Sequence, residues 1–529
     1  MRHKIFEQFI QRDENFYGEF HLAKKTIKNK HMNKSLIYYI TLLLIFSALT
    51  GCKKSLEEEV FSQIYTEKFY KSANDAEAAI TAAYGPFGDM YSGPAANLIA
   101  DFSADQVYPR PVVARNTFTL FNYDPNFTSQ KSFNREFESP VQVWRSCYAG
   151  IEKANWVLDK VPGTSMDAGR KDQILGEAYF LRGLYHWMLA KNFGDVIIKT
   201  APSRTEEEAF FGTSPVADVY KQIDEDLEKA VASLPDYSNT LVKGRPSKQA
   251  ALALQAKAAL YAENWPVALA KAEQVITSGK VGLMPDVKTV FEFAKEDAAR
   301  FENLFAFESE GTAAPNRSSQ ITSLFGPQNS TGPQYAKVSF GSAFAYPAFF
   351  ASFNPIDKRR TLLDTNYVNT SGAVVPQKSI TPITPFGVLV KKYQDPVSTN
   401  GSGSNIPVLR YADILLIAAE AEARQSGATI TAYGYINQVR TRAGLPDLTG
   451  GLGQEAFVDS VLQERSWELF AEADRWYDLT RTEKFMTVIP LAVSDLFPVR
   501  TPELKHRYFP IPQDEINANP KIVQNPAWK

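Results

Sequence analysis

Three glutamates repeat at four-residue steps near the carboxyl end of the chain. Glu464, Glu468 and Glu472 share one face of a predicted helix, and Arg465 and Arg475 lie beside them. Like charges at this spacing repel each other, so cationic groups must neutralise the row. A catalytic carboxylate pair or a divalent-ion site could be built from it. We favour a structural ion network, because three Glu on a rigid helix without clustered carbonyl or Asn ligands make a poor calcium cage.

The partners that such a network needs are arginines on neighbouring predicted helices. The candidates are Arg410, Arg440, Arg442 and Arg481. We expect Arg475 to join the same network. In this interpretation the row stabilises the fold. Loss of Glu468 should then cost a few kcal/mol, because its partner charges would stay buried.

Other reactive side chains are few. Three of the five His residues precede a segment that we expect to be removed: His3, His21 and His31. His186 and His506 alone cannot form a multi-His metal site. Cys147 and His186 lie in apolar helical sequence, where a packed and inert side chain is the usual finding. The sequence therefore predicts no catalytic residues, no bound metal and no cofactor.

Helical periodicity recurs along most of the chain, with apolar residues at steps of three and four. The predicted helices lie roughly at 66–83, 140–160, 168–192, 214–233, 247–262, 266–278, 408–425, 430–442 and 455–473. Two stretches, roughly 84–135 and 309–407, break the pattern. Loops of this length are usually functional or disordered, and their many aromatic residues argue against disorder.

The clearest helix pair spans residues 247–278. Its first helix carries Ala251 and Leu254 on one stripe, and its second carries Ala268 and Ala272 on the facing stripe. Such a pair is similar to a tetratricopeptide unit, and stacked copies form a solenoid wall. The predicted fold class is therefore mainly α: tetratricopeptide-like helix pairs in a solenoid scaffold, with long irregular loops and few short strands.

The beginning of the chain predicts export. Lys34 precedes an apolar stretch at 36–49, and small residues then lead to Cys52. These 14 apolar residues span only about 21 Å of a bilayer core about 30 Å thick, which is typical of a secretory signal. Leu49-Thr50-Gly51-Cys52 resembles the bacterial lipobox, which implies cleavage before Cys52 and its acylation. The alternative is a buried helix that ends in a free Cys.

Two segments flank this signal. Residues 1–31 carry no secretory pattern, and we interpret them as an upstream start-site artefact or a removed extension. The acidic run Glu57-Glu58-Glu59 resembles the export tag of surface-exposed lipoproteins in certain Gram-negative bacteria.

Composition and charge exclude other classes. The 529 residues are 44% hydrophobic and 22% charged, which is ordinary for a globular protein. Of the 57 basic and 59 acidic side chains, 8 and 4 precede residue 52, so 49 and 55 remain, a net charge of −6. Nucleic-acid binding needs a basic field that this balance lacks. A neutral ligand or a protein partner fits better.

Six segments resemble, in this order, the signature segments of the SusD/RagB family. They are LRGLYHWMLAKNFGDVIIKT (181–200), VYKQIDEDLEKAVASLP (219–235), LRYADILLIAAEAEA (409–423), INQVRTRAGL (436–445), ERSWELFAEADRWYDLTR (464–481) and FPIPQDEINANPKIVQNPAW (509–528). The departures are small: Ile197 replaces a commoner proline, and Asp474 stands where a glycine is usual. The resemblance covers nearly all of the chain after Cys52.

The resemblance implies a lipoprotein anchored in the cell outer membrane and facing the exterior. Such proteins cap a SusC-like TonB-dependent barrel, capture an oligosaccharide or another nutrient, and close over the barrel during import. The implied partners are this barrel, the nutrient and the membrane, with no nucleic acid. We predict a binding protein and not an enzyme. A lid for peptides or siderophores and an anchored glycoside hydrolase are the alternatives.

The resemblance also divides the chain. Residues 1–51 form the extension and signal peptide, and 52–529 form the SusD-like domain, with an N-terminal part at about 52–240, a C-terminal part at about 241–529 and a loop-rich insertion at about 309–407.

Ligand contacts are expected in the loops of the N-terminal part and in the insertion. A neutral glycan presents C–H faces and hydroxyls, so its receptor needs aromatic platforms beside a few polar groups. The candidates are Tyr91, Asp105, Tyr108, Arg115 and Tyr335. For each, packing in the core or contact with the barrel is the alternative.

Overall fold

The computed structural model of the chain describes residues 69–111, 113–129, 138–311, 317–327, 335, 338–369, 371–376, 387–396, 398 and 402–529. These residues belong to one unit, Phe69–Lys529. The predicted extension 1–31, the signal segment and Cys52 lie outside the described residues.

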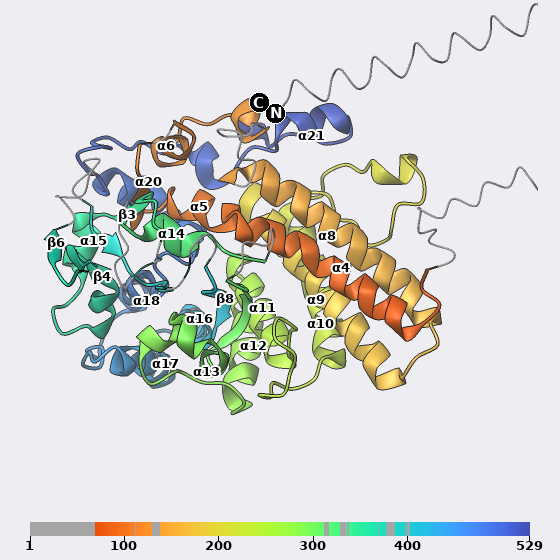
Figure 1. Cartoon of the computed structure of the whole chain (residues 1–529), viewed down its shortest axis with the longest axis horizontal. Helices are drawn as coiled ribbons and strands as arrows, with labels where there is room; N and C mark the ends of the chain where they lie inside the picture. Colours follow the sequence, from red (N-terminus) through yellow and green to blue (C-terminus); the bar gives the residue numbers. More distant parts are fainter. Residues whose placement is uncertain are drawn as a thin grey trace, which may run out of the picture. The chain divides into compact units, whose positions relative to one another are not determined.

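Long helices pack on one another in chain order (Figure 1). They are α4 (Ala73–Ser92), α8 (Pro140–Lys160), α9 (Ala168–Phe193), α10 (Val216–Ser233), α11 (Lys248–Tyr261), α12 (Trp265–Thr277), α16 (Tyr411–Ser426), α17 (Ile430–Arg442) and α18 (Gln454–Glu468). Each contacts the next, and α12 contacts α16 across the intervening insertion. The predicted mainly α fold of stacked, tetratricopeptide-like helices is confirmed.

Short polar side chains fix where these helices begin. The Ser72 hydroxyl accepts a hydrogen bond from the Asp75 N–H at 3.3 Å, and the Asp75 carboxylate accepts from the Ser72 N–H at 2.9 Å. Ser247 caps α11 and Thr429 caps α17 through the backbone N–H three residues on, at 3.2 and 3.1 Å. Each cap satisfies an N–H group that has no carbonyl partner at the start of a helix.

Glycines let neighbouring helices approach closely. A Cβ at Gly150 of α8 would collide with the Tyr185 ring of α9. A Cβ at Gly183 of α9 would lie 3.2 Å from the Leu227 side chain of α10. A larger side chain would displace the Tyr185 ring at Gly150 and crowd Leu227 at Gly183, so both glycines permit the close spacing of the three-helix stack.

The first long helix runs further than the sequence predicts. We expected helix up to residue 83 and a loop from residue 84, yet α4 continues through Pro86 to Ser92. Proline removes one backbone donor and pushes away the preceding turn, which leaves backbone groups unpaired. The Tyr185 hydroxyl satisfies two of them: it donates to the Ala83 carbonyl at 2.7 Å and accepts from the Phe87 N–H at 3.1 Å.

The helix predicted over 455–473 also ends elsewhere. α18 stops at Glu468, and Ala471 and Ala473 adopt the left-handed conformation with φ of 58° and 64°. The Lys392 ammonium donates to the carbonyls of Glu468 and Phe470 at 3.1 and 2.7 Å. A distant side chain therefore takes the place of the backbone donors that a longer helix would supply.

Short elements lie between the long helices, in the two stretches that lack helical periodicity and near the end of the chain. The short helices are α5 (Ala95–Asp101), α6 (Val113–Leu120), α7 (Pro125–Ser129), α13 (Glu296–Ala299), α14 (Ile321–Phe325), α15 (Pro347–Ser352), α19 (Arg475–Arg481), α20 (Phe485–Val488) and α21 (Gln513–Ala518). Single 3-10 turns lie at Val161–Gly163, Glu207–Ala209, Val287–Val290, Phe293–Lys295, Lys358–Leu362, Ile489–Leu491, Leu504–Arg507 and Pro526–Trp528.

The strands pair two by two, all antiparallel. β1 (Val107–Pro109) pairs with β3 (Ala343–Ala345), β2 (Asn303–Phe307) with β8 (Ile406–Arg410), β4 (Leu363–Asp364) with β7 (Leu389–Val390), and β5 (Asn366–Val368) with β6 (Val374–Pro376). The β2–β8 ribbon closes the insertion at its base, because it joins the residues just before the insertion to those just after it.

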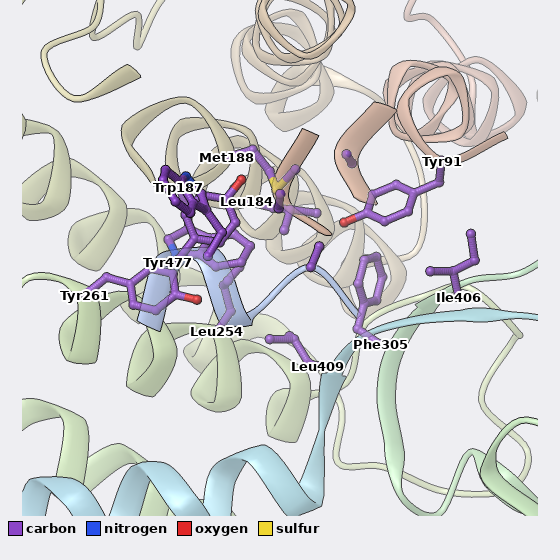
Figure 2. Close-up of a cluster of buried hydrophobic side chains, with 14 of the residues drawn as sticks. Tyr91, Leu184, Trp187, Met188, Leu254, Tyr261, Phe305, Ile406, Leu409 and Tyr477 are labelled. Atoms are coloured by element: carbon purple, nitrogen blue, oxygen red, sulfur yellow. The ribbon is translucent and has the colours of Figure 1, made fainter. Parts of the chain in front are cut away.

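The hydrophobic core lies where this ribbon meets the helices. Phe305 of β2 and Leu409 of β8 face Tyr91 of α4, Leu184 of α9 and Leu254 of α11 (Figure 2). The aromatic residues of the insertion belong to the core as well. Those with buried rings are Phe325, Tyr335, Phe344, Tyr346, Phe349 and Phe353. The insertion therefore packs onto the rest of the protein through these rings, as Tyr346 does on Tyr108 and Phe349 on Phe470.

Candidate functional site

Glu468 lies at the centre of a buried ion network. Its carboxylate pairs with Arg442 at 2.6 Å, with Arg410 at 2.9 Å and with Arg359 at 3.2 Å. Burial alone would raise the pKa of Glu468, but these guanidinium groups hold it well below its usual range. The carboxylate therefore stays ionised inside the protein.

The other two glutamates of the row extend this network. Their pairs are Glu464 with Arg359 (2.7 Å), Glu464 with Arg440 (2.9 Å), Glu472 with Arg410 (2.7 Å) and Glu472 with Lys392 (2.5 Å). Glu302 adds a further carboxylate, which pairs with Arg410 at 2.7 Å and Arg442 at 3.1 Å. Cations from four separate segments thus surround the row, as a structural role requires.

Two predicted members of this network pair elsewhere. Arg475 makes two hydrogen bonds to Asp105, at 2.8 and 2.9 Å. Arg481 pairs with Glu420 at 2.6 Å and with Asp478 at 2.8 Å. The prediction placed Arg475 beside the Glu row, just after the predicted helix 455–473. It is wrong because the turn after Glu468 separates α19 from the Glu row.

The three tyrosines predicted to contact ligand are buried. Tyr91, Tyr108 and Tyr335 expose 5%, 0% and 0% of their surface. The Tyr91 ring is stacked on Phe307 with ring centres 6.2 Å apart, and the Tyr108 ring lies 4.7 Å from that of Tyr346. Tyr91 lies in α4 itself, Tyr108 in β1 and Tyr335 in the insertion, and each ring packs in the interior instead of facing solvent. Their contact with a ligand stays a prediction, and burial favours the packing alternative.

The two polar candidates are engaged in ion pairs. Asp105 binds Arg475, and Arg115 binds both carboxylate oxygens of Glu138, at 2.7 and 2.5 Å. Arg115 is 6% exposed. Ligand contact by Asp105 and Arg115 therefore also stays a prediction, and their pairing supports a structural role.

Cys147 and His186 lie inside the helix stack. Burial raises the pKa of the Cys147 thiol well above its usual range, which keeps the thiol protonated. Burial lowers the pKa of His186 to about 3, and its Nδ1 lies 3.0 Å from the Arg182 carbonyl oxygen. Both groups are inert in this environment at neutral pH.

An open groove lies where α4 meets the first residues of the insertion. Its volume is about 500 Å³, within the range of small-molecule sites. It is lined by Thr81, Tyr84, Gly85, Phe87 and Gly88 of α4, by Lys243, Gly244 and Arg245, and by Ala306, Phe307, Glu308, Glu310 and Arg317. We call this site the α4 groove.

One wall of the α4 groove is an aromatic ring held by charged groups. The Arg245 guanidinium lies 4.8 Å from the centre of the Tyr84 ring and pairs with Glu177 at 2.5 Å. The Tyr84 hydroxyl donates to Glu177 at 2.9 Å. Arg245 also donates to the Thr81 hydroxyl at 3.0 Å. The ring is therefore positioned before any ligand arrives, which lowers the entropic cost of binding.

Other lining residues of the α4 groove carry acceptors. The Glu308 carboxylate accepts from the Asn405 amide at 2.7 Å, and burial raises the pKa of Glu308. Glu310 and Arg317 form an exposed pair at 3.3 Å. At Gly85, which also lines the groove, a Cβ would meet no described atom within 4 Å. The groove thus offers an aromatic face, a carboxylate and a guanidinium to a ligand that bears hydroxyls.

Sequence reasoning missed these residues. Tyr84, Arg245 and Glu308 come from segments that are far apart in the chain, so no local motif joins them. One signal was readable: Gly85 and Gly88 sit beside Tyr84 in an otherwise helical pattern, and conspicuous helical glycines often have a packing or functional reason.

The fold, the groove and the matches to family models together define the class of this protein. A stacked-helix scaffold with an open groove lined by aromatic and polar residues is typical of a protein that binds a small ligand. The model described as "SusD family" matches residues 287–528, and that described as "Starch-binding associating with outer membrane" matches residues 97–260. The chain belongs to the SusD family.

Several relatives match over nearly their whole length. A SusD-like protein of Formosa agariphila is 27% identical, over 93% of this chain and 98% of the relative. Surface glycan-binding protein A of Bacteroides thetaiotaomicron, solved with laminarihexaose, has a TM-score of 0.71 at 20% identity, over 86% of this chain and 100% of that one. A SusD superfamily protein of Parabacteroides distasonis has a TM-score of 0.73 at 23% identity, over 88% and 100%. These structures share the fold.

Two further findings concern the described residues. Within them, none of the helices has the length and apolar character needed to cross a bilayer. Across the same residues, no cluster of three or more His, Cys, Asp or Glu side chains is arranged to hold a metal ion.

Proposed function

We propose that this chain is a lipid-anchored receptor of the outer membrane that binds a neutral glycan and passes it to a SusC-like TonB-dependent barrel. Family membership over most of the chain is the observation that carries the proposal. The relative solved with laminarihexaose supports a glycan as the ligand. The lipobox-like segment at Cys52 supports the anchor.

The α4 groove is our proposed glycan site. Its pre-positioned Tyr84 ring suits the C–H face of a sugar, and Glu308 and Arg245 suit its hydroxyls. It also joins α4 of the N-terminal part to the start of the insertion, which are the regions where the family resemblance implies ligand contact. Tyr91, Asp105, Tyr108, Arg115 and Tyr335 would then support the fold around the site.

A bulky residue at Gly85 tests this site. Gly85→Trp should fill the groove without a clash, because its Cβ points into open space. Gly434 of α17 is the matched control, since it too is an exposed helical glycine with no described atom within 4 Å of a Cβ. We expect Gly85→Trp to weaken laminarihexaose binding at least about tenfold, and Gly434→Trp to leave it unchanged.

Isothermal titration of the full-length lipoprotein in detergent provides the measurement. Maltohexaose and a tetra-alanine peptide serve as comparison ligands. Binding of the peptide and of neither sugar would favour the peptide-lid alternative. Release of shorter sugars during the titration would favour the glycoside hydrolase. Co-purification of the tagged chain with an outer-membrane barrel checks the transport partner.

A further inference from the structure

A second groove lies between α10 and the turn that joins α11 to α12. Its volume is about 490 Å³. It is lined by Val216, Ala217, Tyr220, Lys221, Asp224 and Leu227 of α10, by Gln255, Ala258, Ala259, Tyr261 and Ala262, by Glu263, Asn264 and Val267, and by Arg507 and Tyr508. We call it the α10 groove. The α4 groove shares none of these residues.

Gln255 brings a buried acceptor to this groove. Its amide nitrogen donates to Asp224 at 2.6 Å and to Glu228 at 2.9 Å, which uses both N–H groups and fixes the orientation of the amide. The side chain is 1% exposed, and its Oε1 accepts no hydrogen bond from any residue that the structure describes. A buried carbonyl without a donor is costly, so this atom calls for a donor from outside the chain.

Tyr508 supplies a positioned aromatic ring. Its ring packs on the backbone of Gly194, where a Cβ would lie only 3.1 Å from the ring. Its carbonyl accepts from the Trp528 indole N–H at 3.0 Å, and the next residue, Phe509, donates its N–H to the Asn192 carbonyl at 2.8 Å. The peptide unit that joins Tyr508 to Phe509 is thus held at both its carbonyl and its N–H, which positions the ring beside it.

The charges of the α10 groove balance. Lys221 and Arg507 are matched by Asp224 and Glu263 among its lining residues. A strongly anionic or cationic ligand would meet like charge as well as opposite charge. Aromatic faces from Tyr220 and Tyr508, balanced polar groups and an acceptor without a donor together suit a small, neutral ligand that carries hydroxyls.

We propose that the α10 groove is a second sugar-binding site, which takes one or two neutral hexose units and receives a hydroxyl donor at Gln255 Oε1. It does not depend on the α4 groove. The expected arrangement is a sugar ring against Tyr508, with one hydroxyl directed at Gln255 and others near Lys221 and Asp224.

Saturation-transfer NMR with D-glucose and laminaribiose on the full-length lipoprotein tests this site. Ala217→Trp should plug the groove, because Ala217 is exposed and lines it. Ala232→Trp is the matched control, since Ala232 is exposed on the same helix and is not a lining residue. With the α4 groove filled by Gly85→Trp, we expect the sugar signal to persist, added Ala217→Trp to raise the dissociation constant at least about tenfold, and added Ala232→Trp to leave it unchanged.

A second variant tests whether the Gln255 acceptor takes part in binding the sugar, without filling the α10 groove. Gln255→Leu keeps the volume of the side chain and removes the acceptor, and its former partners Asp224 and Glu228 reach solvent. Weaker sugar binding with an unchanged melting temperature is the expected result. Equal signals in Gly85→Trp with and without Ala217→Trp, no sugar signal in Gly85→Trp, or saturation of the dipeptide glycylglycine in place of the sugars would each overturn the proposal.

Discussion

At the scale of single residues, the ion pairs of Glu468 predict a large contribution to stability. Glu468→Ala should lower the free energy of unfolding by about 3–5 kcal/mol, because Arg359, Arg410 and Arg442 would each lose one carboxylate partner while their charges stay buried. Asp459→Ala on the same helix removes an exposed pair with Lys484 and should cost less than about 1 kcal/mol. Urea unfolding of both variants measures the difference. Equal costs would show that the network contributes little.

The same residue predicts how stability depends on pH. The folded pKa of Glu468 is depressed, so its contribution is fully present above the unfolded value of about 4.3 and is lost as pH falls below it. The difference in unfolding free energy between the wild type and Glu468→Gln should therefore be larger at pH 7 than at pH 3. If the difference in unfolding free energy between these two proteins grew as the pH fell, it would contradict a depressed pKa for Glu468 in the folded state.

The ion network also shows what single residues reveal in a sequence. The four-residue spacing of the glutamates indicates that cations must face them, and Arg410, Arg440 and Arg442 do so. Arg359 and Lys392 were missed because they lie in the irregular insertion, where no periodicity places a side chain. The role of a tyrosine near a predicted loop is equally ambiguous in a sequence, because the same aromatic ring can contact a sugar or pack in the core.

At the scale of helices, Tyr185 holds α4 together at Pro86. Tyr185→Phe keeps the ring against Gly150 and removes the hydroxyl, which leaves the Ala83 carbonyl and the Phe87 N–H without that partner. We expect a loss of about 1–3 kcal/mol in unfolding free energy. Tyr237→Phe, which removes an exposed hydroxyl bonded to Asn239, should change it by less than about 0.5 kcal/mol. Urea unfolding distinguishes the two variants. An unchanged unfolding free energy in Tyr185→Phe would argue that water takes the place of the hydroxyl at the Ala83 carbonyl and the Phe87 N–H.

Helix ends were predictable where local signals decide them. The predicted ranges 140–160 and 430–442 coincide with α8 and α17, because Pro140 and the Thr429 cap mark their starts. The ends of α4 and α18 were not predictable. Each depends on a side chain about 75 to 100 residues away, Tyr185 for α4 and Lys392 for α18, and local sequence carries no trace of such a contact.

At the scale of the whole molecule, the proposed function assigns binding and anchoring to different parts of the chain. The stacked helices and the β2–β8 ribbon form a rigid frame, and both grooves lie on that frame. A receptor built this way can hold its ligand without reshaping its core. The lipobox-like segment, in turn, needs no packing to act, because acyl chains enter the bilayer by their own hydrophobicity. The fold class could be predicted from helical periodicity, whereas the grooves required the tertiary structure.

The two cysteines of the chain allow a direct test of the anchor. Cys52 is the predicted acylation site, and Cys147 is buried in α8 beside Met90, with their sulfur atoms 3.7 Å apart. Cells that express the full chain are fed an alkyne-tagged palmitate and then fractionated. Wild type and Cys147→Ala should both carry the tag and sediment with the outer membrane. Cys52→Ala should lose the tag and leave the membrane fraction, because stable attachment takes more than one membrane signal and this variant lacks its acyl chains. A tag that persists in Cys52→Ala, or that disappears in Cys147→Ala while the protein remains folded, would show that the membrane is reached by another route.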